Sequence, residues 1–481
     1  MPESVKTIYI NGNWSESRNR DTIEVVSPSN GQPIGKISRG SKEDIDAAVV
    51  AARQAFEGVW GNTAAVDRGR LLTQLGQKIL EHVDELTQLE ALDTGKAMKL
   101  ARNDIVATAR YFEFYGGAAD KLHGETIPFL EGYQVLIVRE PRGVAGHIIP
   151  WNYPAQMFGR TIAAALAAGN TAILKPAEEA CLSLIRLTEL AEEVGIPAGV
   201  LNLVTGLGEE AGAALSAHKD IDFLSFTGSP EVGTLVQKAA ADNHVPCVLE
   251  LGGKSPQIVF DDADIEKALP VIVGAIVQNT GQTCSAGSRV LIQRSIYEEF
   301  VTALAKRINA VRVGSHEADL DCGPVISAVQ CERVKGFLER AQADGISVIG
   351  EGKLHASAVD SGFYVKPTLL GPVDETHELA QDEVFGPVLV AMPFDDEEDA
   401  IRIANGTDFG LIAGIWSENG ARQMRLAKKL RVGQVYINGY GAGGGIELPF
   451  GGFKRSGHGR EKGFEALREY TVAKTIVINH K

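Results

Sequence analysis

The sequence predicts an α/β protein with a doubly wound parallel sheet and a second α/β domain. Between residues 144 and 251, short apolar runs alternate with helix-like segments, and each run is apolar almost throughout. Strands of a parallel sheet are buried on both faces, so they read as continuous apolar runs. The alternation resumes less regularly after Gly252, and 481 residues are too many for one hydrophobic core.

The N-terminal part predicts a smaller set of strands and helices. Residues 7–11 read as a short strand, and residues 25–31 as a strand with a turn. Ser41-Lys-Glu-Asp44 is a capping-box pattern before apolar residues at helical spacing. A second helix is expected from Arg68 to Leu92. The alternating segments within 120–142 then predict a β-hairpin that projects from the main body.

The regular part of the chain predicts five strands separated by four helices. The strands are expected at 144–149, 171–174, 201–204, 223–226 and 247–251, and the helices at 155–168, 182–194, 209–218 and 231–240. In the second half, strands are expected at 290–293, 365–370, 388–394, 412–416 and 435–438, with helices at 296–311, 397–405 and 421–430. The alternation of the last dozen residues predicts a terminal strand.

These elements predict a division into two domains and an extension. The first domain comprises 1–119 and 143–251, and the second comprises 252–455. The hairpin of 120–142 and the terminal strand within 467–481 form the extension. Exposed strand edges invite pairing with another chain, so we expect a homodimer or homotetramer.

Composition excludes several classes of function. The net charge is −15 without a basic cluster, which argues against nucleic acid and anionic membranes as partners. The first residues lack the apolar core of a signal peptide, and no apolar run is long enough to span a bilayer. The five cysteines contain no CxxC pair, and the histidines do not join them at metal-ligand spacing. We expect a cytoplasmic protein without a metal site.

Two loops that follow strands carry residues suited to catalysis. Asn152, in Pro150-Trp-Asn-Tyr-Pro154, offers a neutral N–H donor of the kind that an oxyanion hole needs, or else is an ordinary turn residue. Glu250 ends an apolar strand, where burial raises the pKa of a carboxylate and suits it to general-base chemistry. In a later loop, Cys284 stands between two glycines and can become an activated nucleophile, or remain a small buried hydrophobe.

Other strand-end loops suit a nucleotide. Lys175 and Glu178 flank a proline and can hold the two hydroxyls of a ribose, or form a solvated ion pair. Gly228 and Ser229 precede a helix, and the free N–H groups of its first turn form a binding site for pyrophosphate. The GxGxxxG run after the third strand has the wrong spacing for a dinucleotide fingerprint.

The chain resembles the NAD(P)-dependent aldehyde dehydrogenase superfamily from end to end. Glu250-Leu-Gly-Gly-Lys-Ser-Pro and Gly281-Gln-Thr-Cys284 are similar to its two signature segments, and their separation matches as well. The other matching motifs, in chain order, are Pro150-Trp-Asn-Tyr-Pro, Phe226-Thr-Gly-Ser, Glu383-Val-Phe-Gly-Pro and Pro449-Phe-Gly-Gly-Phe-Lys. Six ordered motifs make a chance match negligible.

The resemblance implies a mechanism. Cys284 attacks the aldehyde, Asn152 holds the oxyanion, hydride leaves for the nicotinamide, and Glu250 activates the water that hydrolyses the thioester. The residues expected to bind NAD are Trp151, Lys175, Glu178, Gly228, Ser229, Gly233, Leu251, Glu383 and Phe385. Glu178 favours NAD over NADP, because a 2′-phosphate would face its carboxylate.

Two alternatives to this reaction use the same fold. A CoA-acylating relative resolves the thioester with CoA and usually lacks the carboxylate at Glu250. A non-catalytic structural descendant, such as a lens crystallin, has lost or altered active residues, whereas Cys284, Asn152 and Glu250 are all present. Many members also carry Lys where this chain has Thr161, which leaves the proton exit from Glu250 open, although Glu461 is retained.

The substrate is expected to touch Arg160, Gln278 and Tyr153. Arg160 either binds the acidic tail of a substrate, as in relatives that oxidise semialdehydes, or pairs with a neighbouring acid of the chain. Gln278 stands where succinic semialdehyde dehydrogenases carry a second Arg. The small residues of 439–445 predict a roomy entrance. We expect a bulky aldehyde or semialdehyde with a polar or acidic tail; an aminoaldehyde, a betaine-type aldehyde or a simple aliphatic or aromatic aldehyde stays open.

Overall fold

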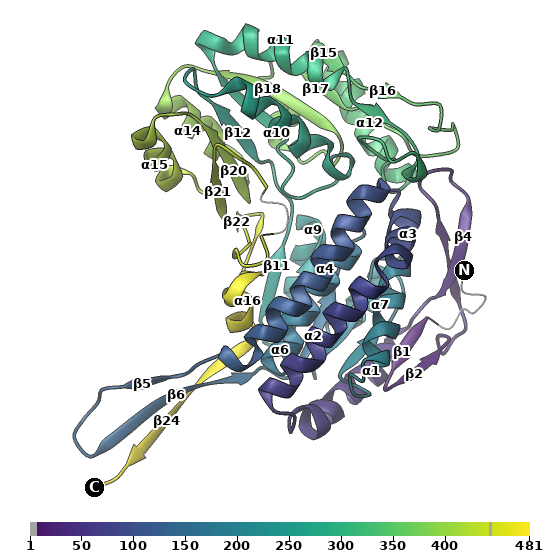
Figure 1. Ribbon diagram of the computed structural model, residues 1–481, viewed down its shortest axis with the longest axis vertical. Helices are drawn as coiled ribbons and strands as arrows, with labels where there is room; N and C mark the ends of the chain where they lie inside the picture. Colours follow the sequence, from purple (N-terminus) through teal and green to yellow (C-terminus); the bar gives the residue numbers. More distant parts are fainter. Residues whose placement is uncertain (1–6, 442–444) are drawn as a thin grey trace.

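The computed structural model describes residues 7–441 and 445–481, and it contains two large sheets in two lobes (Figure 1). The first sheet has eight strands in the order β2-β1-β9-β8-β7-β10-β11-β23. Their bounds in that order are Asn13–Ser15, Ile8–Ile10, Leu201–Leu203, Thr171–Lys175, Val144–Ile148, Phe223–Thr227, Cys247–Glu250 and Gly457–His458. The five strands β9, β8, β7, β10 and β11 are parallel, as predicted.

Alternate residues of these strands face two different helical layers. On one side the core includes Val144 and Ile173 with helices α1 (Lys42–Ala55), α8 (Ala213–Ser216) and α9 (Pro230–Ala241). On the other side it includes Ala145 and Ala172 with a larger helical layer. That layer comprises α2 (Ala65–Glu81), α3 (Val83–Thr94), α4 (Met98–Ala118), α5 (Pro154–Met157), α6 (Ala163–Ala168) and α7 (Leu182–Glu193). Burial on both faces explains the continuous apolar runs.

The strand order reverses between β7 and β10. From β7 the chain moves outward through β8 and β9, and it then returns to place β10 and β11 on the opposite side of β7. In doubly wound sheets, ligands bind at this switch point, outside the carboxyl ends of the strands. The loops after β7, β10 and β11 therefore share one crevice.

The second sheet has seven strands in the order β15-β17-β18-β13-β12-β20-β21. Their bounds are Val348–Glu351, Thr368–Leu370, Val388–Phe394, Arg289–Gln293, Pro256–Val259, Ile412–Trp416 and Gln434–Ile437. One face packs on α10 (Ile265–Val277) and α11 (Tyr297–Ile308). The other face packs on α12 (Ala328–Ala343), α13 (Glu378–Gln381), α14 (Glu397–Asn405) and α15 (Gly420–Lys429).

Several elements differ from the sequence expectation. The expected helix from Arg68 to Leu92 is broken at His82, whose φ of −105° and ψ of 18° separate α2 from α3. Helix α4 and helix α12 had no counterpart among the predicted elements, nor did β12, which lies inside the second sheet. The capping box was predicted correctly, since Ser41 N–H donates to Asp44 Oδ2 at 2.9 Å.

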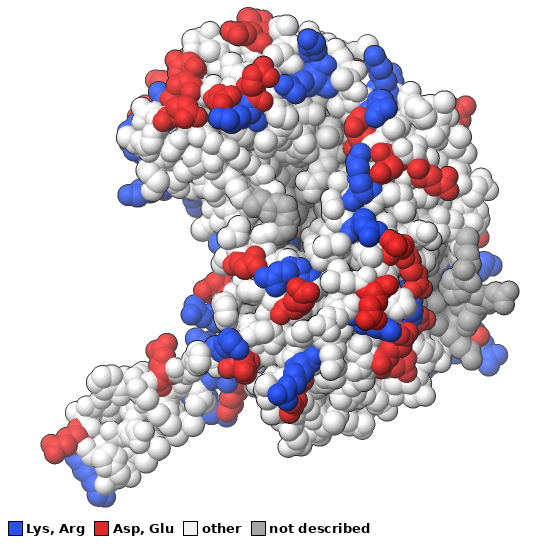
Figure 2. Space-filling model, viewed as in Figure 1, with Lys and Arg blue, Asp and Glu red and all other residues white. Residues whose placement is uncertain are grey.

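The hairpin and the terminal strand together form an arm. Strands β5 (Glu125–Ile127), β6 (Tyr133–Pro141) and β24 (Thr471–Asn479) make a three-stranded antiparallel sheet in the order β24-β6-β5. The arm projects from the body beside α16 (Gly463–Glu469), and its visible face carries few charged side chains (Figures 1 and 2). Its exposed apolar residues include Phe129, Ile476 and Val477.

The remaining strands form small two-stranded sheets. These are β3 (Thr22–Val26) with β4 (Pro33–Ser38), β14 (Arg312–Val313) with β16 (Lys353–Leu354), and β19 (Phe409–Gly410) with β22 (Phe453–Lys454). A deep hollow lies between the two lobes (Figure 2).

Candidate active site

The loop that carries Cys284 begins at the end of α10. Asn279, Thr280 and Gly281 have φ values of 48°, 57° and 72°, so the chain makes a sharp left-handed turn. Two of these residues are not glycine, and such backbone is costly unless its surroundings hold it. The buried side chain of Gln282 does so: it donates to Asn279 O at 3.1 Å and accepts from Ile326 N–H at 2.9 Å. The cysteine loop is therefore a fixed support.

Cys284 lies directly against the segment that follows β11. A Cβ added to Gly253 would lie 2.2 Å from Cys284 O, so only glycine permits this approach. Cys284 is partly exposed, whereas Cys181, Cys322 and Cys331 are buried. Desolvation raises the pKa of the Cys284 thiol to about 12, and the Arg160 guanidinium opposes that shift.

Asn152 is tied to the cysteine loop by two hydrogen bonds. Its side-chain Nδ2 donates to Gln282 O at 2.9 Å, and its backbone carbonyl accepts from Asn279 Nδ2 at 2.9 Å. The Asn152 side chain is buried. A side-chain amide has two N–H groups, and the bond to Gln282 uses one of them. The second can donate to an oxygen that forms beside Cys284.

Glu250 ends β11 and is 1% exposed. Neither of its carboxylate oxygens has a hydrogen-bond partner among the described residues. Arg160 Nη2 lies 3.7 Å from Glu250 Oε2, and Arg160 Nε forms an ion pair with Glu461. Desolvation raises the pKa of Glu250, Arg160 lowers it, and Glu461 raises it again. A buried carboxylate with a raised pKa and no fixed hydrogen bond suits proton transfer.

A cavity of about 640 Å³ lies at the carboxyl ends of β7, β10 and β11 and contains Cys284 in its wall. Among the expected cofactor residues, it brings together Trp151, Gly228, Ser229, Leu251, Glu383 and Phe385. Trp151 and Phe385 meet edge to face with ring centroids 5.4 Å apart. Glu383 accepts from Gly253 N–H at 2.8 Å, and burial raises its pKa to about 7.

The cavity has features that fit a dinucleotide. Ser229 caps α9, a twelve-residue helix whose first turn opens on the cavity beside Gly228 and Ser229. A helix N-terminus of this kind attracts phosphate. The glycine at 252 is required by close packing, since its Cβ would lie 2.2 Å from Glu383 Oε2. Glu383 is thereby brought next to the loop that follows Glu250.

Three expected cofactor residues lie outside the described lining of this cavity. Lys175 ends β8, the neighbour of β7, and its Nζ donates to Glu178 Oε2 at 2.9 Å. Lys175 is buried, and Glu178 is partly exposed. Gly233 packs on Leu251, because its Cβ would lie 2.5 Å from Leu251 Cδ2. Lys175 and Glu178 therefore sit one strand further along the same sheet edge.

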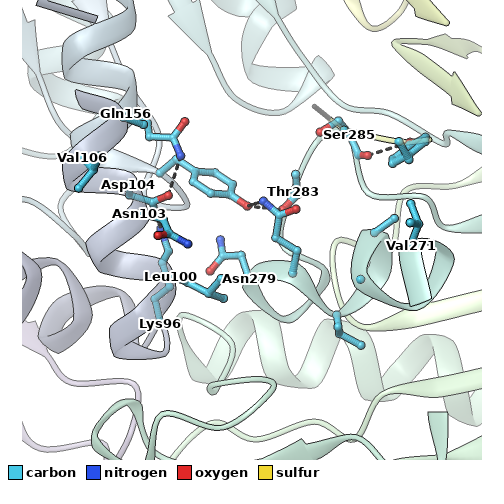
Figure 3. A pocket seen from close by; sticks show the side chains of 18 of the residues that line it. Lys96, Leu100, Asn103, Asp104, Val106, Gln156, Val271, Asn279, Thr283 and Ser285 are labelled. Carbon is cyan, nitrogen blue, oxygen red and sulfur yellow. Dashed lines mark hydrogen bonds and ion pairs between the residues drawn. The ribbon is translucent and has the colours of Figure 1, made fainter. Parts of the chain in front are cut away.

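A second cavity, of about 730 Å³, lies between α4 and α10 and is shown in Figure 3. Its wall includes Thr283 and Ser285, the neighbours of Cys284, so the cysteine loop separates the two cavities. Two of the three predicted substrate residues, Tyr153 and Gln278, line it. The Tyr153 hydroxyl lies 2.8 Å from Thr283 Oγ1 and accepts from Gln278 Nε2 at 3.0 Å.

One wall of this second cavity is unexpectedly polar. Lys96 and Asp104 form a buried ion pair, and Glu90 lies 3.5 Å from Lys96 Nζ. Gln156 Nε2 donates to Asp104 Oδ1 at 2.6 Å, and a dashed line marks this hydrogen bond in Figure 3. Lys96 also lies over the Tyr153 ring, 4.3 Å from its centroid. Sequence reasoning missed these residues, and a helical prediction for Met98–Ala118 would have placed Asp104 on the apolar face.

Arg160 does not lie among the described residues that line the second cavity. It belongs to the short helical segment Phe158–Ile162, is 5% exposed, and is engaged by Glu250 and Glu461. The structure therefore favours the second of the two alternatives for this residue, pairing with a neighbouring acid. Part of the expected roomy entrance, residues 442–444, lies outside the described residues.

The residues that the structure describes, 7–441 and 445–481, lack two further kinds of feature. No group of three or more His, Cys, Asp or Glu side chains in these ranges can hold a metal ion. No helix in them is long and apolar enough to cross a membrane.

Comparison with known proteins gives consistent matches. The family model described as "Aldehyde dehydrogenase family" matches residues 14–476. An aldehyde dehydrogenase of Emericella nidulans is 41% identical over 471 residues, which cover 98% of this chain and 94% of the relative. A betaine aldehyde dehydrogenase of Bacillus subtilis is 38% identical over 480 residues, covering 99% and 98%.

Solved structures agree with these matches. A crystal structure from Burkholderia cenocepacia, assigned as an aldehyde dehydrogenase, is 61% identical with a TM-score of 0.98; the match covers 98% of this chain and 100% of that one. The betaine aldehyde dehydrogenase of Staphylococcus aureus in complex with NAD+ is 39% identical with a TM-score of 0.96, and the match covers 99% and 95%.

Proposed function

The chain belongs to the aldehyde dehydrogenase family and is an NAD-dependent aldehyde dehydrogenase, and we propose that Cys284, Asn152 and Glu250 perform its chemistry. The observation that carries this proposal is the convergence of two distant segments on the cysteine loop. Asn152 is hydrogen-bonded to the cysteine loop, and Gly253 brings the Glu250 segment against the Cys284 carbonyl.

The first half of the reaction is acylation of the enzyme. The Cys284 thiolate adds to the aldehyde carbon and forms a thiohemiacetal, whose oxyanion meets the second N–H of Asn152. NAD, when bound, would supply the acceptor for the hydride of the same carbon. The oxyanion then collapses to a carbonyl, and the acyl group remains on sulfur as a thioester. The fixed cysteine loop keeps the Cys284 thiol and the Asn152 amide at a constant relative position during both steps.

The second half is hydrolysis of the thioester. Glu250 takes a proton from water as the water attacks the acyl carbon, and the bond to sulfur breaks. The products are a carboxylic acid and the free thiol. Glu250 suits this role because its oxygens are buried yet have no hydrogen-bond partner among the described residues.

We propose that NAD occupies the cavity at the carboxyl ends of the first sheet. Trp151, Gly228 and Ser229 would face the pyrophosphate, with Gly233 and Leu251 as packing support. Glu383 and Phe385 would hold the nicotinamide ribose. Lys175 and Glu178, one strand further, would hold the adenosine ribose. Glu178 supports a preference for NAD, because a 2′-phosphate would bring like charges together.

We propose a bulky aldehyde with a neutral, hydrogen-bonding tail as substrate. The cavity beside Thr283 and Ser285 is large, and Asn103, Gln156 and Gln278 offer amides along its walls. Its ionised lining groups are compensated: Lys96 pairs with Asp104, and Arg110 with Glu447 at 2.7 Å. A carboxylate tail would therefore find little unpaired positive charge among the described lining residues. Arg160 is engaged elsewhere, which supports a polar tail over an acidic one.

The arm supports assembly of identical chains. Strands β5, β6 and β24 extend from the body with exposed apolar side chains at their outer faces. Strand edges of this kind pair with other chains. We propose a homodimer or homotetramer, and a monomer in light scattering at micromolar concentration would contradict it. We also propose the division into a cofactor domain (1–119, 143–251) and a second domain (252–455).

An assay of acid formation tests the reaction. Purified protein is incubated with NAD and a panel of aldehydes, with and without CoA, and both NADH and the acyl product are measured. We expect NADH and free carboxylic acid in equal amounts, independent of CoA. Cys284→Ala should abolish turnover while NAD binding and the fold survive. CoA-dependent formation of acyl-CoA, or no oxidation of any aldehyde, would contradict the proposal.

A further inference from the structure

Arg160 occupies a position where it joins two acids that are far apart in the chain. Its Nε contacts Glu461, and its Nη2 lies 3.7 Å from Glu250 Oε2. The guanidinium also stacks on Phe450, with Cζ 4.4 Å from the ring centroid. All three ionic side chains are almost completely buried. A guanidinium held on one face by a ring and on two edges by acids has little freedom to turn toward a substrate.

Its neighbour cannot supply the same charge. Thr161 follows Arg160 in the chain, is fully buried, and donates its hydroxyl to Met157 O at 3.0 Å. Glu461 is fixed from the opposite side, since it accepts from Ser225 Oγ at 3.0 Å. Arg160, which lies 3.7 Å from Glu250, is thus anchored through Glu461 to Ser225 on strand β10 of the first sheet.

We propose that Arg160 is a positioning residue for deacylation: its guanidinium bridges Glu461 and Glu250 and holds the Glu250 carboxylate toward the thioester. This inference rests on the role proposed above for Glu250. An Arg stays protonated at any physiological pH, so it orients and stabilises the charged base without carrying the proton itself. The Arg would thereby act on thioester hydrolysis and leave substrate recognition to the second cavity.

Loss of the Arg160 charge and loss of the Glu461 charge should shift the pKa of Glu250 in opposite directions. Arg160 lowers the pKa of Glu250, and Glu461 raises it. Loss of the Arg160 charge should therefore move the acid limb of deacylation to higher pH. Loss of the Glu461 charge leaves Arg160 to Glu250 alone and should move that limb to lower pH. Other charged or titratable groups that interact with Glu250 include Arg460, Lys462 and Cys284, and none of these changes in the variants.

An ester substrate isolates deacylation from the cofactor. The Cys284 thiolate displaces p-nitrophenolate from p-nitrophenyl acetate, the acetyl group stays on sulfur, and water releases acetate and restores the thiol. The initial burst of p-nitrophenolate counts acylated sites, and the later steady rate reports hydrolysis. Both are measured between pH 5.5 and about 9 for the wild type, Arg160→Leu, Arg160→Lys and Glu461→Gln.

We expect Arg160→Leu to keep the burst and to lower the steady rate at neutral pH about tenfold, with its acid limb about one pH unit or more higher. Arg160→Lys should recover part of the rate. Lysine keeps the positive charge but lacks the planar guanidinium that contacts both acids. Glu461→Gln should shift the limb in the opposite direction. Arg53→Gln is the matched control: its ion pair with Asp222 lies at the amino ends of the strands, and it should behave as wild type.

Different outcomes contradict different proposals. A wild type without burst or aldehyde oxidation would refute the proposed function itself. A normal burst with acid limbs that are unchanged in Arg160→Leu and Glu461→Gln would refute the bridge alone. If Arg160→Leu instead raises KM for succinic semialdehyde far more than for butanal, with normal hydrolysis, Arg160 reads a substrate carboxylate. Should Arg160→Leu fail to fold, the shifts of Arg160→Lys and Glu461→Gln decide the question.

Discussion

Replacement of Glu250 by Gln tests the proposed base with the least disturbance of the fold. The two side chains have nearly the same shape, and Glu250 is 1% exposed with no hydrogen-bond partner on either oxygen among the described residues. Burial already raises the pKa of this carboxylate, so a neutral amide removes a group whose charge the site disfavours. The amide oxygen can still face Arg160 Nη2, which lies 3.7 Å from Glu250 Oε2.

The expected effect is confined to the second half of the reaction. Loss of a general base lowers a rate by about 10²–10⁴. At about 1.36 kcal/mol per tenfold, this corresponds to about 3–5 kcal/mol of activation free energy. Acylation depends on Cys284 and Asn152, neither of which changes, so one NADH should still form for each site. The enzyme should then stall as a thioester.

Stopped-flow absorbance of NADH separates the two phases. We expect a burst of one equivalent per site in Glu250→Gln, followed by a steady rate at least about a hundredfold below wild type. Mass spectrometry of the quenched enzyme should find the acyl group on Cys284. Steady turnover within a few-fold of wild type would refute the assignment of Glu250 as base, and loss of the burst itself would place Glu250 in acylation instead.

Three other predictions concern the thiol and the two cavities. Because desolvation raises the pKa of Cys284 to about 12, its alkylation by iodoacetamide without NAD should accelerate up to about tenfold per pH unit from pH 7 to 9; a plateau below pH 8 would contradict this. Glu178→Ala should raise kcat/KM with NADP relative to NAD about tenfold, with Glu189→Ala as the control, and an unchanged ratio would remove Glu178 from the ribose site. Gln156→Leu should lower kcat/KM about tenfold for a hydroxyl-tailed aldehyde relative to its alkyl analogue, and equal losses on both would contradict a polar-tail substrate.

The sequence by itself determined the parallel sheet and the placement of the candidate catalytic motifs at its strand ends. Continuous apolar runs such as Val144–Ile148 and Phe223–Thr227 are typical of strands covered on both faces, and the sheet contains them in that form. Residues at strand ends, such as Asn152 and Glu250, then meet at one edge because the strands are parallel. Local sequence is sufficient to predict where these residues lie, since the apolar pattern locates the strands and their parallel direction places the strand ends at one edge.

The local pattern was insufficient where tertiary packing dominates. Helix α4 mixes small, aromatic and charged residues, including the buried Asp104, and its stability comes from packing on α2 and α3 and from the ion pair with Lys96. The short strand β12 follows Gly252-Gly253, and it is stabilised by neighbours β13 and β20, which come later in the chain.

The surroundings of Arg160 show most clearly what only the tertiary structure decided. From the sequence, this residue either reads a substrate carboxylate or pairs with an acid, and both alternatives use the same side chain at the same helical position. The structure brings Glu461 and Phe450 against the guanidinium and directs it toward Glu250. The sequence predicts which residues reach a strand end or a helix face. The direction of a long buried side chain is set by partners that only the folded chain brings within a few ångströms.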